Sequence, residues 1–257
     1  MIVLEATQLN VKIGQQTLCR NLQFTLKAGE IWGLLGQNGS GKSTLLSTLG
    51  GLNPTSEGKV LLYGKQLKQY SIKQIAQKLG FLFQEVNTAF AQSVWDYCLT
   101  GRYPHLNYFK KETQADKAIV KASLQKMELM HLANRAITTL SGGEKRRLSI
   151  AAILAQRPAI YLLDEPTNHL DLKHQTQMML HFNKLAMTEG AAILMALHDI
   201  NLVQRFCHFV ILLLKNGEIL QGPLPDILTQ KNVESLYQLP MRKIEHNDMV
   251  YWMPMPK

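Results

Sequence analysis

The stretch of sequence that decides the fold is Gly36-Gln37-Asn38-Gly39-Ser40-Gly41-Lys42-Ser43-Thr44. It fits the pattern GxxxxGK[ST] and lies between the apolar run 31–35 and a helical pattern. A short apolar run of this kind is typical of a buried parallel strand. Glycines let the backbone wrap closely around phosphates, and N–H groups at a helix N-terminus add partial positive charge. The stretch predicts an α/β fold whose phosphate loop, residues 36–44, contacts a bound nucleotide with all nine residues.

Two residues of the phosphate loop have chemically distinct roles in this motif. Lys42 is expected to reach the β- and γ-phosphates, and Ser43 is expected to place its hydroxyl on Mg²⁺. A glycine-rich turn that matches by chance is the alternative, which the strand before it and the helix after it disfavour. The motif alone indicates a nucleotide-binding protein, because kinases, GTPases and many ATPases share it.

A second buried strand ends in two carboxylates. The apolar run 160–163 leads directly into Asp164 and Glu165. A strand-end acid beside the phosphate loop can hold Mg²⁺ through water, and we assign this role to Asp164. Glu165 is the candidate general base that polarises an attacking water. The alternative is an exposed acid pair at a helix start, and the phosphate loop upstream favours the catalytic interpretation.

A second candidate anion site lies at Leu140-Ser141-Gly142-Gly143-Glu144, just before a long helical run. A Ser-Gly-Gly sequence at a helix N-terminus favours anion binding. A chain with one phosphate loop has no evident use for a second anion site of its own. The second site would instead be useful for binding the nucleotide of another copy. The alternative is an ordinary helix cap, in which Ser141 and Glu144 form a capping box.

This pattern resembles the signature sequence of the ABC ATPase family, and further family marks follow in the expected order. Gln84 is similar to the Q-loop glutamine, Asn168-His169-Leu170-Asp171 resembles the D-loop, and His198 resembles the switch histidine. The resemblance covers about residues 1–230. It implies a P-loop NTPase core with an antiparallel β subdomain and an inserted α-helical subdomain.

The resemblance also implies a mechanism and partners. Family members form a head-to-tail dimer that holds two ATP molecules, each between the phosphate loop of one chain and the signature of the other. The residues implied on the signature side are Ser141, Gly142, Gly143, Glu144 and the D-loop Asp171.

On the catalytic side, the family implies that His198 holds the γ-phosphate and the water that Glu165 activates. Gln84 would bind Mg²⁺ and carry the change into the helical subdomain. One position departs from the family: many members stack adenine on an aromatic residue, and Ile13 occupies the matching place here. An aliphatic contact covers a base without stacking on it, so GTP use stays open.

The length and composition favour one domain. The chain has 257 residues, 46% of them hydrophobic, which is enough for a large core. We expect strands broken by one helix over the first 85 residues, so that the core comprises 1–85 and 159–257, with the helical subdomain at about 86–158. A strand pair is expected near 209–214 and 218–221, followed by a small helical and extended cap after residue 223.

Several features bear on location. The longest apolar run of the expected strands, 209–214, is too short to cross a bilayer, and the N-terminus lacks the pattern of a secretory signal. Cys19, Cys98 and Cys207 form no CxxC pair, which disfavours a disulfide framework or a zinc site and favours a reducing cytosol. The expected place is therefore peripheral, on the cytoplasmic face of the plasma membrane.

The run 101–105, Gly-Arg-Tyr-Pro-His, is similar to one in ATPases of iron-siderophore, haem and cobalamin importers. The implied partners are a second copy, two multi-span permease subunits and, indirectly, a periplasmic binding protein. The run is expected near the groove that takes a membrane subunit, or in the core of the helical subdomain. An oxyanion importer of molybdate type and the separate ATPase of an exporter stay open.

The net charge of +9 fits nucleic acid, anionic lipid or a solvated lysine excess equally well. It keeps one further alternative open, an ABC-type ATPase that acts on the ribosome or on DNA. Ribosomal members usually carry two cassettes and DNA-repair members a long coiled coil, and neither is visible, so nucleic acid is not the expected partner.

Overall fold

The computed structural model describes the chain in six segments, with residue ranges 1–14, 16–55, 57–84, 92–106, 111–247 and 249–255. A six-stranded sheet forms its centre, in the order β10-β9-β3-β8-β7-β6. Neighbours from β9 to β6 pair in parallel, and β10 is antiparallel to β9. The bounds are β3 Ile31–Gly36, β6 Leu79–Leu82, β7 Ile160–Asp164, β8 Ala192–Ala196, β9 Phe209–Leu213 and β10 Ile219–Pro223. Parallel strands place their carboxyl ends at one edge, which is where open α/β sheets bind ligands.

Both faces of this sheet are covered, which explains why its strands are apolar throughout. Alternate residues of one strand enter two different clusters: Tyr161 and Leu163 of β7 pack on one side, Ile160 and Leu162 on the other. Successive side chains of a strand point to opposite faces, so one strand serves two cores. The central sheet is therefore held in place from both sides.

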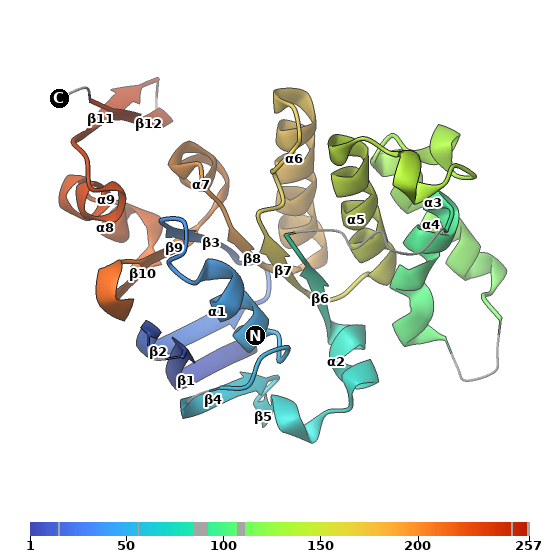
Figure 1. The fold of residues 1–257 in the computed structure, drawn as a ribbon, viewed down its shortest axis with the longest axis horizontal. Coiled ribbons are helices and arrows are strands. Elements are labelled where there is room, and N and C mark those ends of the chain that lie inside the picture. Colours follow the sequence, from blue (N-terminus) through green and yellow to red (C-terminus); the bar gives the residue numbers. More distant parts are fainter. Residues whose placement is uncertain (15, 56, 85–91, 107–110, 248, 256–257) are drawn as a thin grey trace.

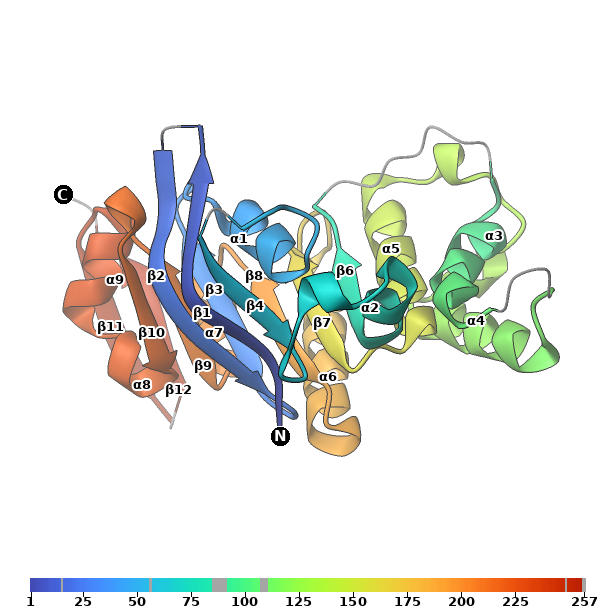
Figure 2. The ribbon, with the colours of Figure 1, turned by 90° about the horizontal axis from the view of Figure 1, so that it is seen from below.

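One face packs on helix α1, Lys42–Leu49, and on an antiparallel sheet of order β2-β1-β4-β5. Figures 1 and 2 show α1 between the two sheets, close to β1, β3 and β7. The bounds are β1 Ile2–Ile13, β2 Gln16–Lys27, β4 Glu57–Leu62 and β5 Lys65–Gln66. Trp32 belongs to this core, stacked on Phe209 at 4.7 Å and edge-on to Phe24 at 5.0 Å. The phosphate loop thus connects two elements, β3 and α1, that are both packed in this core.

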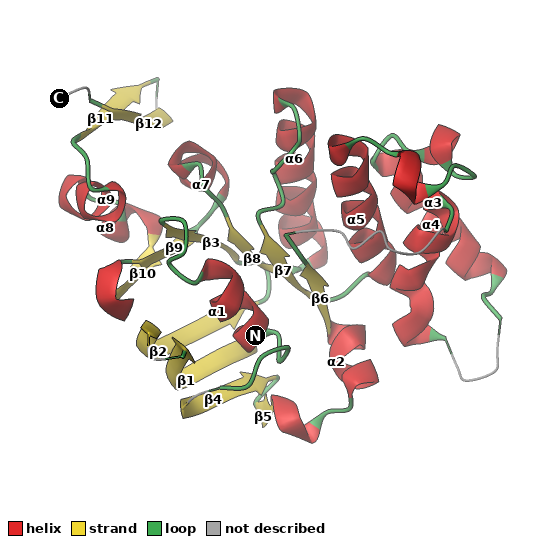
Figure 3. Cartoon of the chain, in the orientation of Figure 1, coloured by secondary structure: helices red, strands yellow, loops and turns green. Residues whose placement is uncertain are grey.

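The other face carries α6, Leu172–Glu189, and α7, Ile200–Phe206, and the same core continues into the helical part of the chain. Figure 3 shows that part as helices joined by loops, beside the edge strand β6. Its main helices are α3 Val94–Leu99, α4 Gln114–Lys126 and α5 Gly142–Gln156, with short 3-10 turns η2 Thr100–His105, η3 Met130–Leu132 and η4 Ile137–Thr139.

The C-terminal cap comprises two helices and a hairpin. They are α8 Leu224–Ile227, α9 Gln230–Tyr237, β11 Met241–His246 and β12 Met249–Pro254, preceded by the turn η5 Lys215–Gly217. The hairpin is antiparallel and packs on α7 through the buried Trp252. An extended cap after residue 223 was expected, and this paired hairpin gives it a defined shape.

The predicted fold class is confirmed, and the strands at 31–35, 160–163 and 192–196 are present within one residue of their expected bounds. The expectation of one helix in the first 85 residues was wrong. A second helix, α2 Ile72–Lys78, and the 3-10 turn η1 Leu67–Gln69 precede β6. α2 has seven residues and buries none of them, so its apolar positions Ile72, Ile75 and Ala76 form a pattern too short to predict a helix. Within the described segments no helix is long and apolar enough to cross a membrane.

Candidate nucleotide site

The phosphate loop connects β3 to α1. Gly41 is the N-cap of α1 and has φ of +96°, a conformation that favours glycine. A Cβ on Gly41 would also lie 2.8 Å from Leu18 Cδ1, so Leu18 of β2 packs directly against the loop at this residue. No side chain caps α1, and no acid lies in its first turn. The N–H groups of that turn are therefore available to a phosphate.

Lys42 is buried at the centre of the loop. Its Nζ donates hydrogen bonds to the carbonyl oxygens of Gly36 at 2.8 Å and Gln37 at 3.3 Å. Burial lowers the pKa of Lys42, while Glu165 and Asp164 act in the opposite direction. The ammonium is thus held beside the loop, at the position from which the motif assigns it to the phosphates.

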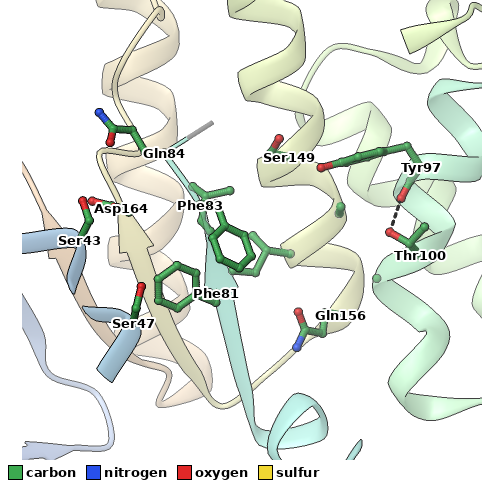
Figure 4. A pocket seen from close by; sticks show the side chains of 14 residues that line it. Ser43, Ser47, Phe81, Phe83, Gln84, Tyr97, Thr100, Ser149, Gln156 and Asp164 are labelled. Atoms are coloured by element: carbon green, nitrogen blue, oxygen red, sulfur yellow. Dashed lines mark hydrogen bonds between the residues drawn. The ribbon is translucent and has the colours of Figure 1, made fainter. Parts of the chain in front are cut away.

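Asp164 ends β7, and its side chain meets that of Ser43 (Figure 4). The residue is 3% exposed, and its Oδ1 is buried without a hydrogen-bond partner. Burial raises the pKa of Asp164, and the hydrogen bond from Ser43 partly offsets this. An orphaned buried carboxylate oxygen beside a hydroxyl is a donor set that fits Mg²⁺. Since no three described His, Cys, Asp or Glu side chains converge there, phosphates and waters would complete the coordination.

Glu165 is the point at which the predicted catalytic residues meet. Its Oε1 lies 2.5 Å from Nε2 of His198, which donates in the tautomer protonated there. Its Oε2 accepts hydrogen bonds from Nδ2 of Asn168 and from Nε2 of Gln84, the latter at 3.0 Å. Glu165 itself is 6% exposed and has φ of +49°, with its N–H bonded to Ala196 O at 3.1 Å. Residues that follow β6, β7 and β8 therefore converge on one carboxylate.

Arg146 is a central residue that the sequence reasoning missed. It is 2% exposed, and its guanidinium donates to main-chain oxygens on both sides of the catalytic edge. NH1 contacts Phe83 O at 2.5 Å and Gln84 O at 3.2 Å, and NH2 contacts Asp164 O. Burial lowers the pKa of Arg146 to about 10, so it stays charged near neutrality. No sequence signal marked it, because Arg146 stands in the charged run Glu144-Lys145-Arg146-Arg147, which also fits a solvated helix face.

The signature residues lie at the start of α5. Ser141 is the N-cap, and the Glu144 carboxylate accepts hydrogen bonds from Ser141 N and Oγ, both at 2.8 Å. Gly143 lies beneath the D-loop: a Cβ there would be 2.9 Å from the carbonyl oxygen of His169. None of the hydrogen bonds among described residues joins this helix start to the phosphate loop. Asp171 is likewise apart from the loop, because it caps α6 through His174 N at 2.8 Å.

Ile13 ends β1, where it pairs with Gln16, and it is 57% exposed. A cavity of about 250 Å³ lies beside the phosphate loop, but Ile13 does not line it. Its walls are Gln16–Leu18, Gln37–Ser40, Leu213–Lys215, Gly217 and Leu236. From the β1–β2 hairpin, the start of β2 therefore lines this cavity and Ile13 at the end of β1 does not, while a contact of Ile13 with the base stays a prediction.

A larger cavity, about 750 Å³, separates the nucleotide edge from the helical part (Figure 4). Phe81 and Phe83 project into it from β6 and its end, and Tyr97 faces them from the other side. From the run 101–105, Gly101 lines the cavity, Arg102 is buried against Asp116 at 2.9 Å, and Tyr103 is 58% exposed. The run thus contributes to both the cavity and the core of the helical part. Its expected place near a membrane-subunit groove stays a prediction.

Comparisons with known proteins agree with this geometry. Residues 19–168 match the family described as ABC transporter. The chain is 35% identical to the ferric enterobactin transport ATP-binding protein FepC of Escherichia coli (strain K12), covering 92% of this chain and 87% of that protein. It is 33% identical to the hemin import ATP-binding protein HmuV of Shewanella denitrificans (strain OS217), covering 96% and 97%.

Among solved structures, the chain is similar to a metal-chelate type ABC transporter in an inward-facing conformation. The TM-score is 0.85 at 31% identity, over 100% of this chain and 99% of that one. The match extends through the C-terminal cap as well as the nucleotide half. This chain belongs to the ABC transporter family, as the ATPase domain that binds and hydrolyses ATP.

Proposed function

We propose that this chain is the motor subunit of an importer for a metal chelate, such as a siderophore complex, haem or cobalamin. Two copies would work on two permease subunits at the cytoplasmic face of the membrane. The likeness to FepC, HmuV and a metal-chelate type transporter over nearly their whole lengths supports the substrate class. The convergence of Gln84, Glu165 and His198 carries the ATPase part of the proposal.

The residues present fit Mg²⁺, which would neutralise charge developing on the phosphates. Ser43 and Asp164 would hold the ion, and Lys42 would leave the loop carbonyls for the β- and γ-phosphates. Gln84 would approach the ion, which requires that it release Glu165. The hydrogen bonds seen here therefore correspond to a resting arrangement that nucleotide would rearrange.

Hydrolysis needs one water and one base. The water oxygen forms a bond to the γ-phosphorus, the bond from that phosphorus to the β–γ bridging oxygen breaks, and the water proton passes to Glu165. His198, whose Nε2 now lies at the same carboxylate, would turn from Glu165 to donate to a γ-phosphate oxygen. ADP and phosphate are the products.

A second copy supplies what one chain lacks. Ser141 caps a fifteen-residue helix whose first turn includes Gly143, and no hydrogen bond among the described residues joins this helix start to its own phosphate loop. In a head-to-tail dimer this terminus would face the partner's γ-phosphate, so that ATP closes the pair and hydrolysis opens it.

The helical region, about 86–158, would be the part that contacts the membrane subunits. The 750 Å³ cavity is open between the two parts of the chain, and it is lined by the aromatic residues Phe81, Phe83 and Tyr97. Aromatic anchors of this kind are common at the centre of protein interfaces. A short cytoplasmic segment of a permease is the occupant we propose for it.

The first experiment substitutes Glu165→Gln. We expect this variant to bind ATP and pair, while its turnover falls by about 10²–10⁴-fold because the amide cannot accept the proton. Glu189→Gln, at the exposed end of α6, is the matched control and should turn over like the wild type. Normal turnover in Glu165→Gln would place the base elsewhere.

The import proposal is tested separately, by tagging the chain in its native cell and identifying what co-purifies in mild detergent. A many-span permease with a periplasmic binding partner supports import. Ribosomes or DNA-repair proteins in its place would leave the ATPase chemistry intact and remove the transport role.

A further inference from the structure

The C-terminal cap contacts the nucleotide site at two of its loops. Gln37 of the phosphate loop donates from Nε2 to Leu236 O at 2.8 Å. The next residue, Tyr237, donates from its hydroxyl to the carbonyl oxygen of His198 at 3.3 Å. Leu236 is 2% exposed and also lines the cavity beside the phosphate loop. The end of α9 therefore bridges the loop that holds phosphate and the loop that holds the switch histidine.

The hairpin β11–β12 forms hydrogen bonds to α7, the helix that follows the switch histidine. Asn201, in the first turn of α7, accepts from Trp252 N at 2.8 Å and donates to Trp252 O at 3.2 Å. The Trp252 ring is buried and donates from Nε1 to Gln204 Oε1 at 3.3 Å. Two of these hydrogen bonds join the Asn201 side chain to the Trp252 backbone and the third joins two side chains, so a shift of α7 is coupled to the hairpin.

Helix α9 and the hairpin β11–β12 pack together as one unit. Glu234 of α9 accepts a hydrogen bond from Met241 N, the first residue of β11, at 3.2 Å. Val233 and Leu236 bury the inner face of α9 in the same cluster that holds Trp252. A displacement of the hairpin would therefore reach Tyr237.

We propose that the cap, described over residues 224–247 and 249–254, positions the catalytic site: Tyr237 fixes the backbone of His198, and Leu236 holds the Gln37 side chain of the phosphate loop. Tyr237 is a positioning residue, since its hydroxyl touches a main-chain oxygen and not the nucleotide. Burial, with Asp199 nearby, raises the pKa of its phenol, which keeps the hydroxyl protonated and able to donate.

His198 must be placed closely to act on the bound nucleotide. Its Nε2 lies 2.5 Å from Glu165, and a catalytic group that drifts by a fraction of an ångström loses much of its effect. Fixing the carbonyl of residue 198 restricts rotation of the peptide that carries the imidazole. Loss of that bond should lower the rate of hydrolysis more than it lowers nucleotide affinity.

The test is Tyr237→Phe in the full-length chain with Mg²⁺ and ATP. Removing one hydrogen bond should lower kcat about fivefold, with KM for ATP changed by less than about twofold. The matched control is Tyr70→Phe, because Tyr70 also donates to a main-chain oxygen, Leu62 O at 2.8 Å, but away from the site. Tyr70→Phe should lower Tm while leaving kcat unchanged.

A second variant keeps the proposal testable if Tyr237→Phe folds poorly. Asn201→Ala frees the hairpin from α7 and should lower kcat in the same way, and the double variant should be less than additive because both act through His198. Wild-type kcat in both single variants, or an equal loss of kcat in Tyr70→Phe, would overturn the positioning role.

This inference rests on the proposed role of His198, and one more variant separates the two. If His198→Ala keeps wild-type kcat, the catalytic assignment itself fails. If His198→Ala loses turnover while Tyr237→Phe and Asn201→Ala keep it, the assignment stands and only the positioning role of the cap is lost.

Discussion

The chain has two helix N-termini that are suited to anions, and they differ in their capping. α1 begins at Gly41 without a side-chain cap and without an acid in its first turn. α5 is capped by Ser141 in a full capping box. In this box the Glu144 carboxylate accepts hydrogen bonds from both Ser141 N and Ser141 Oγ. The first terminus leaves its backbone N–H groups free to bind a ligand. The second terminus already has hydrogen-bond partners within the chain for some of its backbone N–H groups.

This difference explains why a single chain has one complete phosphate site. α1 has Lys42, Ser43 and Asp164 around it, whereas the start of α5 carries an acid and faces the D-loop of its own chain. A phosphate at α5 would have to arrive from outside and turn the Ser141 hydroxyl away from Glu144. Substitutions of Lys42, Ser141 and Glu144, at or near these termini, test the contrast.

The largest effect is expected at the uncapped terminus. Lys42→Ala removes the only ammonium that the described structure places in the phosphate loop, and we expect turnover to fall by at least about 10²-fold with loss of tight ATP binding. Steady-state hydrolysis and nucleotide titration measure this. Lys121→Ala, an exposed lysine of α4, is the control. Wild-type turnover in Lys42→Ala would remove the phosphate-loop assignment.

The capped terminus should act in the partner chain. Ser141→Arg puts a bulky cation at the start of α5 and should block closure, although its own phosphate loop is intact. Mixing Ser141→Arg chains with Lys42→Ala chains should leave at most one working site in each mixed pair. Two working sites per pair would contradict a site shared between chains.

The smallest effect concerns stability. Glu144→Ala removes the capping box of α5, at a cost of about 1 kcal/mol at neutral pH. Hydrogen bonds from Ser141, first from its N–H and then from its hydroxyl, lower the pKa of Glu144 below its ordinary 4.5. A depressed folded pKa means that the stabilisation is present above the unfolded value and is lost as pH falls through the folded one. Denaturant unfolding at pH 7 and near pH 4 measures the change.

The matched control is a capping box without a charge. α2 begins with Ser71 and Gln74, whose side-chain oxygen accepts from Ser71 N at 2.8 Å. Gln74→Ala should cost a similar amount at both pH values, because the amide does not titrate. If the cost of Glu144→Ala is equally independent of pH, the carboxylate is not the group that caps α5.

Sequence reasoning was most successful where one strand leads straight into one functional residue. The runs before Gly36 and Asp164 predicted β3 and β7, because continuous apolar strands with a motif at the end leave few alternatives. The same reasoning missed β6, which has four residues, and α2, whose side chains are all solvent-facing or half-buried. Both elements are shorter than the window of about 11–18 residues over which a hydrophobic period can be recognised.

The site shows the same division. Each predicted residue around Glu165 was marked by its own motif, but the contacts that hold the site were not, because they run through main-chain oxygens. Arg146 binds carbonyls of Phe83, Gln84 and Asp164, and Tyr237 binds that of His198. A carbonyl carries no residue-type pattern, so partners of this kind become visible only in three dimensions.

The close approach of the D-loop makes the two glycines of the signature unequal in mutational tolerance. At Gly142 the nearest atoms are side-chain carbons of His169, at 3.8 and 3.9 Å, which an added methyl group would meet at ordinary contact distance. At Gly143 the obstacle is a main-chain oxygen at 2.9 Å, and no compensating change of residue type at 169 can remove it. In a library of all substitutions scored for growth on the transported substrate, Gly142→Ala should survive and Gly143→Ala should not. The second glycine is a position where only one amino acid satisfies the fold, whatever nucleotide or cargo the assembly handles.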